Sequence, residues 1–178
     1  MRIGIDFGTS TTQIGYFDEE KKKVINLIEV KTGYKSYPSI AYFWFDNQSK
    51  PHLTFELADR QGELRKYPFF KMDLLEPKIV YGYPTREIIK GFFNHLQQKF
   101  LKEYTIEEIA ICVPNNFGLN ARKLLKEICS EVWPEINITL LSEPLAGYLG
   151  FLAEYTNALK RKEVFILRIK KYNLITFN

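Results

Sequence analysis

The sequence predicts an α/β protein built on one mixed sheet, in which antiparallel strands come first and parallel strands follow. Residues 1–57 contain short runs of alternating apolar residues separated by turn residues, a pattern typical of an antiparallel meander. From Thr85 onward, helical apolar stripes alternate with continuous apolar runs, which indicates strand–helix–strand units with parallel neighbours and right-handed crossovers. We therefore expect the meander on one side of the sheet, the parallel strands on the other, and helices over at least one face.

The chain opens with a predicted hairpin. Apolar residues alternate at Ile3, Ile5 and Phe7, and a second alternating run covers Gln13–Phe17. Gly8 and the four hydroxyl residues after it separate the two runs, which is typical of a tight turn between strands.

Three further strands are predicted before residue 58. They cover Val24–Lys31, which completes the meander, and then Ser39–Phe45 and His52–Leu57. The stretch Ala58–Tyr81 has no clear period, and no element is predicted there.

The second half of the chain alternates helices and strands. Thr85 is the expected N-cap of a long helix that ends at Tyr104, and we assign its phenylalanine stripe to the core rather than to a ligand site. Ile106–Val113 is continuously apolar near its end, as in a central strand buried on both faces. The remaining predicted elements are a helix over 121–132, a strand over Ile136–Leu141, a helix marked by Leu145, Tyr148, Leu149 and Leu152, and a strand over Val164–Ile169.

The turn after the first strand is the strongest candidate site. Asp6 lies beside it, Gly8 lets the backbone approach a ligand closely, and turn amides with hydroxyl groups can hold a phosphate. A carboxylate beside a phosphate requires a cation between them, and Mg²⁺ with its water ligands suits that place. The alternative is an ordinary hairpin in which the hydroxyl groups only cap backbone groups.

Charge and composition exclude several function classes. The net charge is +4, but the segment from Lys160 onward carries +5, so the first 159 residues carry −1. A body close to neutrality argues against a nucleic-acid-binding surface. No apolar run approaches the roughly 20 residues that span a bilayer, and the N-terminus lacks the apolar stretch of a signal peptide. We therefore expect a cytoplasmic protein without membrane or nucleic-acid partners.

The cysteines and histidines give no metal pattern. Cys112 and Cys129 form no Cys-x-x-Cys pair and are expected to be buried free thiols in a reducing compartment. His52 and His95 lie far apart in the sequence without a ligand pattern around them, which argues against a zinc site.

Four motifs resemble a known superfamily. Residues Gly4–Ser10 resemble the first phosphate loop of the actin, hexokinase and heat-shock chaperone ATPases. Three stretches are similar to the DnaK-type chaperone branch: Tyr37–Phe43 to its Thr-Pro-Ser segment, Ile111–Arg122 to its Val-Pro-x-x-Phe motif and following helix, and Ser142–Tyr148 to its Asn-Glu-Pro-x-Ala-Ala motif. The order and spacing match over residues 1 to about 167.

The resemblance implies a ribonuclease-H-like sheet in each of two lobes, with ATP and Mg²⁺ between them. It implies that Asp6 orients the magnesium ion through water, and that Glu143 helps to place the waters of the metal. The phosphates would be held by Gly8, Thr9, Ser10 and Thr11. Phosphoryl transfer needs in-line geometry and charge neutralisation more than covalent help, and these groups would supply both.

Two of the implied roles have plain alternatives. Lys71 matches the lysine that approaches the γ-phosphate, and otherwise it is a solvated surface lysine. Glu143 is otherwise a first-turn acid stabilised by the helix dipole. Pro114 matches a proline that the family uses as an interdomain switch, although any buried strand can end in proline.

The end of the chain departs from the family pattern. Residues 1–167 match the first lobe, but 168–178 form a divergent basic tail where the family has its second phosphate loop. We expect a truncated domain, from a frame shift or a deletion, with negligible hydrolysis and at best millimolar nucleotide affinity. The gene sequence downstream, searched for Gly-Gly-Gly-Thr in another frame, tests this. An exposed cleft face would also favour self-association.

Other functions compete with an ATP-binding lobe. A non-enzymatic interaction module that keeps the fold is supported by the missing second loop. A sugar or acid kinase shares the first loop but lacks the Glu-Pro-x-Ala series found at Ser142–Tyr148. A ribonuclease-H-like nuclease could use Asp6 and Glu143, although the near-neutral body disfavours it.

Overall fold

The main sheet joins strands from the first 38 residues to two strands between residues 108 and 142. The computed structural model describes residues 1–21, 23–57, 64–149 and 151. The main sheet has the strand order β11-β10-β1-β2-β3, and β4 pairs with β2 off this path. Its strands are β1 (Arg2–Phe7), β2 (Thr11–Asp18), β3 (Lys23–Asn26), β4 (Tyr37–Pro38), β10 (Glu108–Val113) and β11 (Asn137–Ser142).

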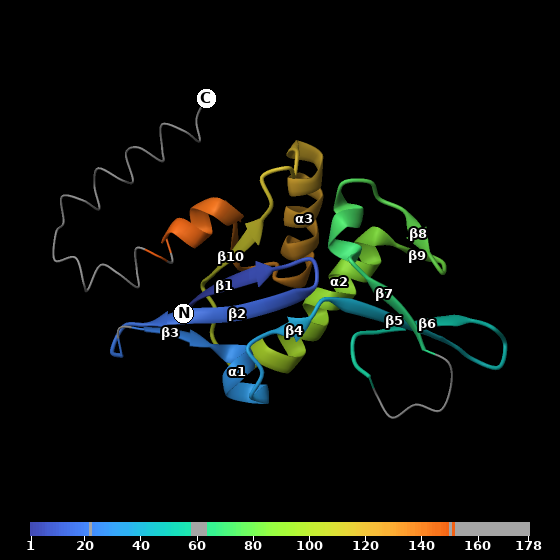
Figure 1. The fold of residues 1–178 in the computed structure, drawn as a ribbon, viewed down its shortest axis with the longest axis horizontal. Coiled ribbons are helices and arrows are strands. Elements are labelled where there is room, and N and C mark those ends of the chain that lie inside the picture. The colour runs from blue at the N-terminus through green and yellow to red at the C-terminus, as the bar shows by residue number, and fades with distance from the viewer. Residues whose placement is uncertain (22, 58–63, 150, 152–178) are drawn as a thin grey trace.

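Strand directions confirm the predicted mixed sheet. β1 pairs antiparallel with β2, and β2 pairs antiparallel with β3. β10 runs parallel to β1 on one side and to β11 on the other. The β1–β2–β3 meander therefore occupies one half of the sheet, and the parallel strands occupy the other half (Figure 1).

Two helices cover one face of this sheet and enclose the core. α2 (Thr85–Leu96) continues as a π-helical turn (Gln97–Leu101), and α3 (Leu119–Val132) lies next to α2. Phe92, Phe93 and Phe100 are fully buried against the apolar face of β1 and β10, so their assignment to the core is confirmed. Because alternate strand residues share a face, the fully buried residues of β10 are Ile109, Ile111 and Val113.

The other face of β10 is only partly covered, which corrects one expectation. Ala110 and Cys112 are half-buried rather than buried, so β10 is central but not buried on both faces. They line a cavity of about 450 Å³, together with residues of β1, β2 and the helix that follows β11.

A second, smaller sheet carries the middle of the chain. Its strand order is β6-β5-β7, and the pair β8-β9 forms a short ribbon. The bounds are β5 (Ile40–Phe45), β6 (Pro51–Thr54), β7 (Arg65–Pro68), β8 (Ile79–Val80) and β9 (Tyr83–Pro84), with a 3-10 helix η1 (Phe70–Leu74) between β7 and β8. The strands predicted near β5 and β6 are confirmed, and β7, η1 and β8 occupy the stretch without a prediction.

The predicted strand Val24–Lys31 is wrong in its second half. β3 ends at Asn26, whose side chain accepts hydrogen bonds from the amides of Ile28 and Glu29 and so caps a short helix, α1 (Leu27–Thr32). Gly33 ends that helix in the left-handed conformation, with φ 77°. The Asn26 cap at one end and the glycine cap at the other therefore outweigh the strand propensity of the apolar run.

Thr85 does not cap α2. The N-cap residue is Pro84, and the Thr85 hydroxyl instead donates to the Lys78 carbonyl and accepts from the Lys78 amide. The buried Thr85 thus attaches the start of α2 to the segment before it.

The end of the chain is described only in part. A helix begins at Glu143 and covers 143–149, as predicted. Leu152, the strand predicted at Val164–Ile169 and the basic tail 168–178 lie outside the described residues. In the ranges that the structure describes, no helix is long and apolar enough to cross a membrane.

Candidate functional site

Three parallel strands end at the same edge of the main sheet. β1, β10 and β11 are adjacent and parallel, and Val113 pairs with Ser142 where β10 and β11 end. Asp6 is the penultimate residue of β1, and Glu143 directly follows β11. In open α/β sheets, ligands bind at this carboxyl edge, so the topology brings two candidate acids to a favourable place.

Lys71 joins these acids from a distant part of the sequence. It lies on η1, its side chain is 1% exposed, and its Nζ atom is 2.9 Å from Glu143 Oε1. The ammonium also lies 5.6 Å from the centre of the Phe7 ring and 5.7 Å from that of the Phe117 ring. A buried cation needs such partners, and the interpretation of Lys71 as a solvated surface lysine is therefore wrong.

The charges of Lys71 and Glu143 both act on the pKa of Asp6. Burial raises the pKa of Asp6, the Lys71 ammonium opposes that rise, and the Glu143 carboxylate adds to it. Two carboxylates and one ammonium leave this edge with an excess negative charge. An edge of that kind favours a cation, or an anion that arrives with its own cation.

The β1–β2 turn at Gly8–Ser10 is closed tightly by its own backbone. The Gly8 amide donates to the Asp6 carbonyl at 3.0 Å. A Cβ atom on Gly8 would lie 2.3 Å from the Thr11 carbonyl oxygen, so no larger residue fits this turn. Ser10 and Thr11 are exposed, and Thr9 is partly exposed, so the turn is not buried under other segments.

Sequence reasoning missed Cys112 as part of this site. Burial, with smaller contributions from Asp6 and Glu143, raises the pKa of the Cys112 thiol to about 11, and Lys71 opposes the rise. The strand register places Cys112 beside Asp6, because Ile5 pairs with Ile111 and the next residues of the two strands are Asp6 and Cys112.

The Pro114 motif forms a braced turn beside Lys71. The Phe117 amide donates to the Pro114 carbonyl at 3.1 Å. Arg122 donates from Nε to the Phe117 carbonyl at 2.7 Å and from Nη2 to the Pro114 carbonyl at 3.3 Å. The helix-borne Arg122 thus fixes the turn that holds the Phe117 ring near the Lys71 ammonium.

The donor set suits a hard cation with few protein ligands. The described residues contain no group of three or more His, Cys, Asp or Glu side chains that could hold a metal ion. Asp6 and Glu143 offer carboxylate oxygens, which Mg²⁺ prefers, and Mg²⁺ commonly keeps several waters and takes phosphate oxygens as further ligands. The residues present therefore fit a magnesium ion that is held mostly through water.

Apolar side chains surround η1 and the start of α3, next to the turn. Met72 Sδ lies 3.9 Å from Thr9 Oγ1. Among the residues of η1, its flanks and the start of α3, the exposed apolar side chains include Phe69, Met72, Leu75 and Leu119. Self-association through this face stays a prediction.

Comparison of the sequence with models of known families finds no match, and comparison with curated proteins finds none either. What the structure itself establishes is a mixed α/β fold with the sheet order β3-β2-β1-β10-β11.

Proposed function

We propose that this chain is a nucleotide-binding lobe of the ribonuclease-H-like type, similar to the first lobe of a DnaK-type chaperone ATPase. Its ligand is ATP with Mg²⁺, bound at the carboxyl edge of β1, β10 and β11. The observation that carries the proposal is the buried Lys71 ammonium, 2.9 Å from Glu143 and close enough to Asp6 to act on its pKa. A charged cluster of this kind at a sheet edge is typical of a functional site.

Each group at the edge has a distinct role in the proposal. Asp6 and Glu143 orient the waters of the magnesium ion. The turn Gly8–Thr11 holds phosphate oxygens through the hydroxyls of Thr9, Ser10 and Thr11 and through turn amides other than that of Gly8, which donates to the Asp6 carbonyl. Lys71 adds positive charge to this edge. When bound, Mg²⁺ neutralises the charge of the phosphates and so lets them lie beside a carboxylate.

The competing functions separate by ligand. An interaction module that keeps the fold would not bind Mg-ATP at this edge. A sugar or acid kinase would bind Mg-ATP and would also respond to a second, neutral or acidic substrate. A nuclease would bind oligonucleotides in preference to ATP.

The test is a nuclear magnetic resonance titration of the labelled chain with Mg-ATP, because this method detects millimolar binding. We expect saturating amide shifts at Gly8–Thr12 and at Glu143, with a Kd of about 1 mM. Omission of Mg²⁺ should weaken binding at least about tenfold. Asp6→Asn should remove the Mg²⁺ dependence.

Asp18→Asn is the matched control. Asp18 ends β2 at the opposite end of the hairpin, where it accepts hydrogen bonds from the amides of Glu20 and Lys21. The Asp18→Asn variant should bind Mg-ATP with the same affinity as the wild type. Shifts that never saturate, or that map away from the carboxyl edge, would contradict the proposal.

A further inference from the structure

The segment Tyr37–Ser39 connects the Gly8–Ser10 turn to a polar cluster on α2. At its inner end, the Ser39 amide donates to the Ser10 carbonyl at 2.9 Å. The Ser39 and Thr12 hydroxyl oxygens lie 2.9 Å apart, and both side chains are buried. Since β4 also pairs with the first residues of β2, the segment is bonded both to the turn and to the start of β2.

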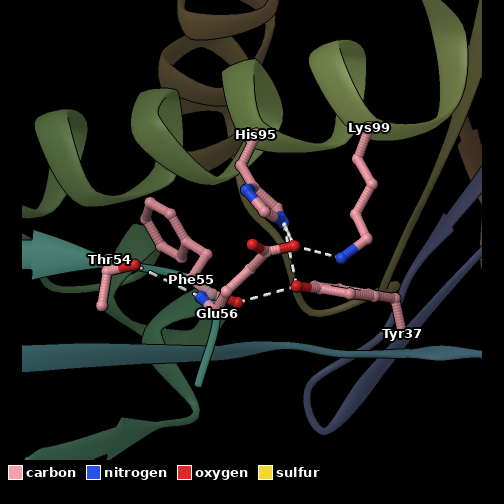
Figure 2. Close-up of polar contacts among 6 residues, drawn as sticks. All are labelled: Tyr37, Thr54, Phe55, Glu56, His95 and Lys99. Atoms are coloured by element: carbon pink, nitrogen blue, oxygen red, sulfur yellow. Dashed lines mark hydrogen bonds and ion pairs between the residues drawn. The ribbon is translucent and has the colours of Figure 1, made fainter. Parts of the chain in front are cut away.

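The outer end of the segment is anchored through Tyr37 (Figure 2). Its hydroxyl donates to the Phe55 carbonyl at 2.8 Å and lies 2.9 Å from His95 Nε2. A tyrosine hydroxyl has one proton, and a carbonyl can only accept. His95 Nε2 must therefore carry a proton and donate to the Tyr37 oxygen.

Charged groups complete this anchor. Glu56 Oε1 forms an ion pair with Lys99 and lies 3.8 Å from His95 Nε2. The Lys99 ammonium also lies 5.1 Å from the centre of the Tyr37 ring. Tyr37 is thus held by residues 55 and 56, which directly follow β6, and by α2 with its π-helical turn.

We propose that Tyr37–Ser39 is a positioning segment for the phosphate turn, and that Ser39 and Thr12 are its positioning residues. The Ser10 carbonyl is occupied by the Ser39 amide, so its negative end does not face a bound anion. The buried Thr12–Ser39 hydroxyl pair fixes the distance between the two segments. This inference rests on the proposed phosphate-binding role of the turn. In that proposal, Thr12, Tyr37 and Ser39 hold no phosphate oxygen.

The decisive variant is the double replacement Thr12→Val with Ser39→Ala. It removes both hydroxyls and therefore leaves no buried polar group without a partner, so the fold is expected to be kept. The amide of residue 39 remains and reports on the bond to the Ser10 carbonyl through hydrogen exchange. We expect this amide to exchange about fivefold faster and Mg-ATP to bind about fivefold more weakly.

Two further variants distinguish positioning from general stability. Thr12→Ser keeps the hydroxyl, so its exchange rate at residue 39 and its Mg-ATP affinity should stay close to those of the wild type. Thr139→Val removes a hydroxyl that bonds to Glu108 on the β10–β11 pair and should change neither. Tyr37→Phe releases the outer anchor and should increase amide exchange at residue 39. Exchange of the Gly8 amide, which is bonded to the Asp6 carbonyl, should not change.

The outcomes separate this inference from the proposed function. Unchanged exchange at residue 39 and unchanged Mg-ATP affinity in the double variant would overturn the positioning role. Faster exchange with weaker binding supports it. If the wild type shows no saturable Mg-ATP shifts, the proposed function fails, whereas the exchange rates still decide whether the segment holds the turn.

Discussion

Lys71 and Glu143 are separated by 72 positions in the sequence, yet their charged atoms lie 2.9 Å apart at the carboxyl edge of the main sheet. The pair is asymmetric, because the Lys71 side chain is 1% exposed and that of Glu143 is 44% exposed. Water can therefore solvate the acid if its partner is lost, but it cannot reach the lysine.

This asymmetry predicts unequal costs of mutation. Glu143→Ala leaves a buried ammonium without its acceptor and should lower the free energy of unfolding by about 2 kcal/mol. Lys71→Met keeps the packed stem and frees an acid that water can solvate, so it should cost less than about 1 kcal/mol. Urea unfolding of the two variants checks the order, and a larger loss for Lys71→Met would contradict the described burial.

Gly8 sets a second prediction. A Cβ atom at this position would lie 2.3 Å from the Thr11 carbonyl oxygen, so Gly8→Ala must distort the turn and should cost about 2–3 kcal/mol. Gly147→Ala is the control, because it lies in the helix 143–149 and its Cβ atom would meet no described atom within 4 Å. That change should stabilise the protein by about 0.5–1 kcal/mol. Equal effects in urea unfolding would refute the crowded turn.

Asp6 should titrate above its usual value of 3.8, because burial and Glu143 outweigh Lys71. A raised folded-state pKa means that the native state is favoured below 3.8 and loses this contribution as the pH rises through the folded-state pKa. Asp6→Asn should therefore be more stable than the wild type at pH 7 while it loses Mg²⁺-dependent nucleotide binding. Such a trade of stability for function is common at functional sites.

Carboxyl carbon resonances measured against pH check this prediction. The pKa of Asp6 should rise further in Lys71→Met and fall in Glu143→Ala. Identical titration of Asp6 in the two variants would show that the three charges do not interact.

His95 predicts a loss of stability in mild acid. Burial lowers the pKa of His95 below 6.5, Lys99 lowers it further, and Glu56 opposes them. A lowered folded-state pKa means that stability is full above pH 6.5 and is lost as the pH falls from there through the folded-state value. His95→Gln keeps a donor for Tyr37 and should remove this step.

Unfolding at several pH values between about 5 and 7.5 measures the step. The Glu56 pKa is lowered by its hydrogen bond to Lys99, so Glu56 titrates below this window. The difference between His95→Gln and the wild type isolates the contribution of His95. Parallel curves for the two proteins would contradict the burial of an uncharged His95.

The strands of the main sheet were predictable because their signals are local. Alternation at Ile3, Ile5 and Phe7 and the apolar run before Val113 each fit one kind of strand. The run from Val24 fits both a strand and a helix, and the choice is made by the Asn26 cap and by Gly33. Local capping geometry was present in the sequence but weaker than the apolar pattern.

The site was only partly predictable, because its members meet through tertiary structure. Asp6 and Glu143 were found from motifs, and the parallel strands bring them to one edge. The burial of Lys71 could not be foreseen, because it depends on the rings of Phe7 and Phe117 from two other segments. Cys112 needed the strand register, which no single stretch of sequence contains.

Cys112 offers a chemical probe of the same charges. Burial and the neighbouring acids raise the pKa of Cys112 to about 11, and burial alone raises that of Cys129 still further. Since the thiolate is the reactive form, both cysteines should react slowly with iodoacetamide at pH 7, and Cys112 should react first. Asp6→Asn removes a nearby negative charge, so it should lower the pKa of Cys112 and speed its alkylation, whereas Cys129 should not change. Mass spectrometry of the labelled peptides gives both rates, and equal acceleration at the two cysteines would indicate general loosening of the fold instead of a local electrostatic effect.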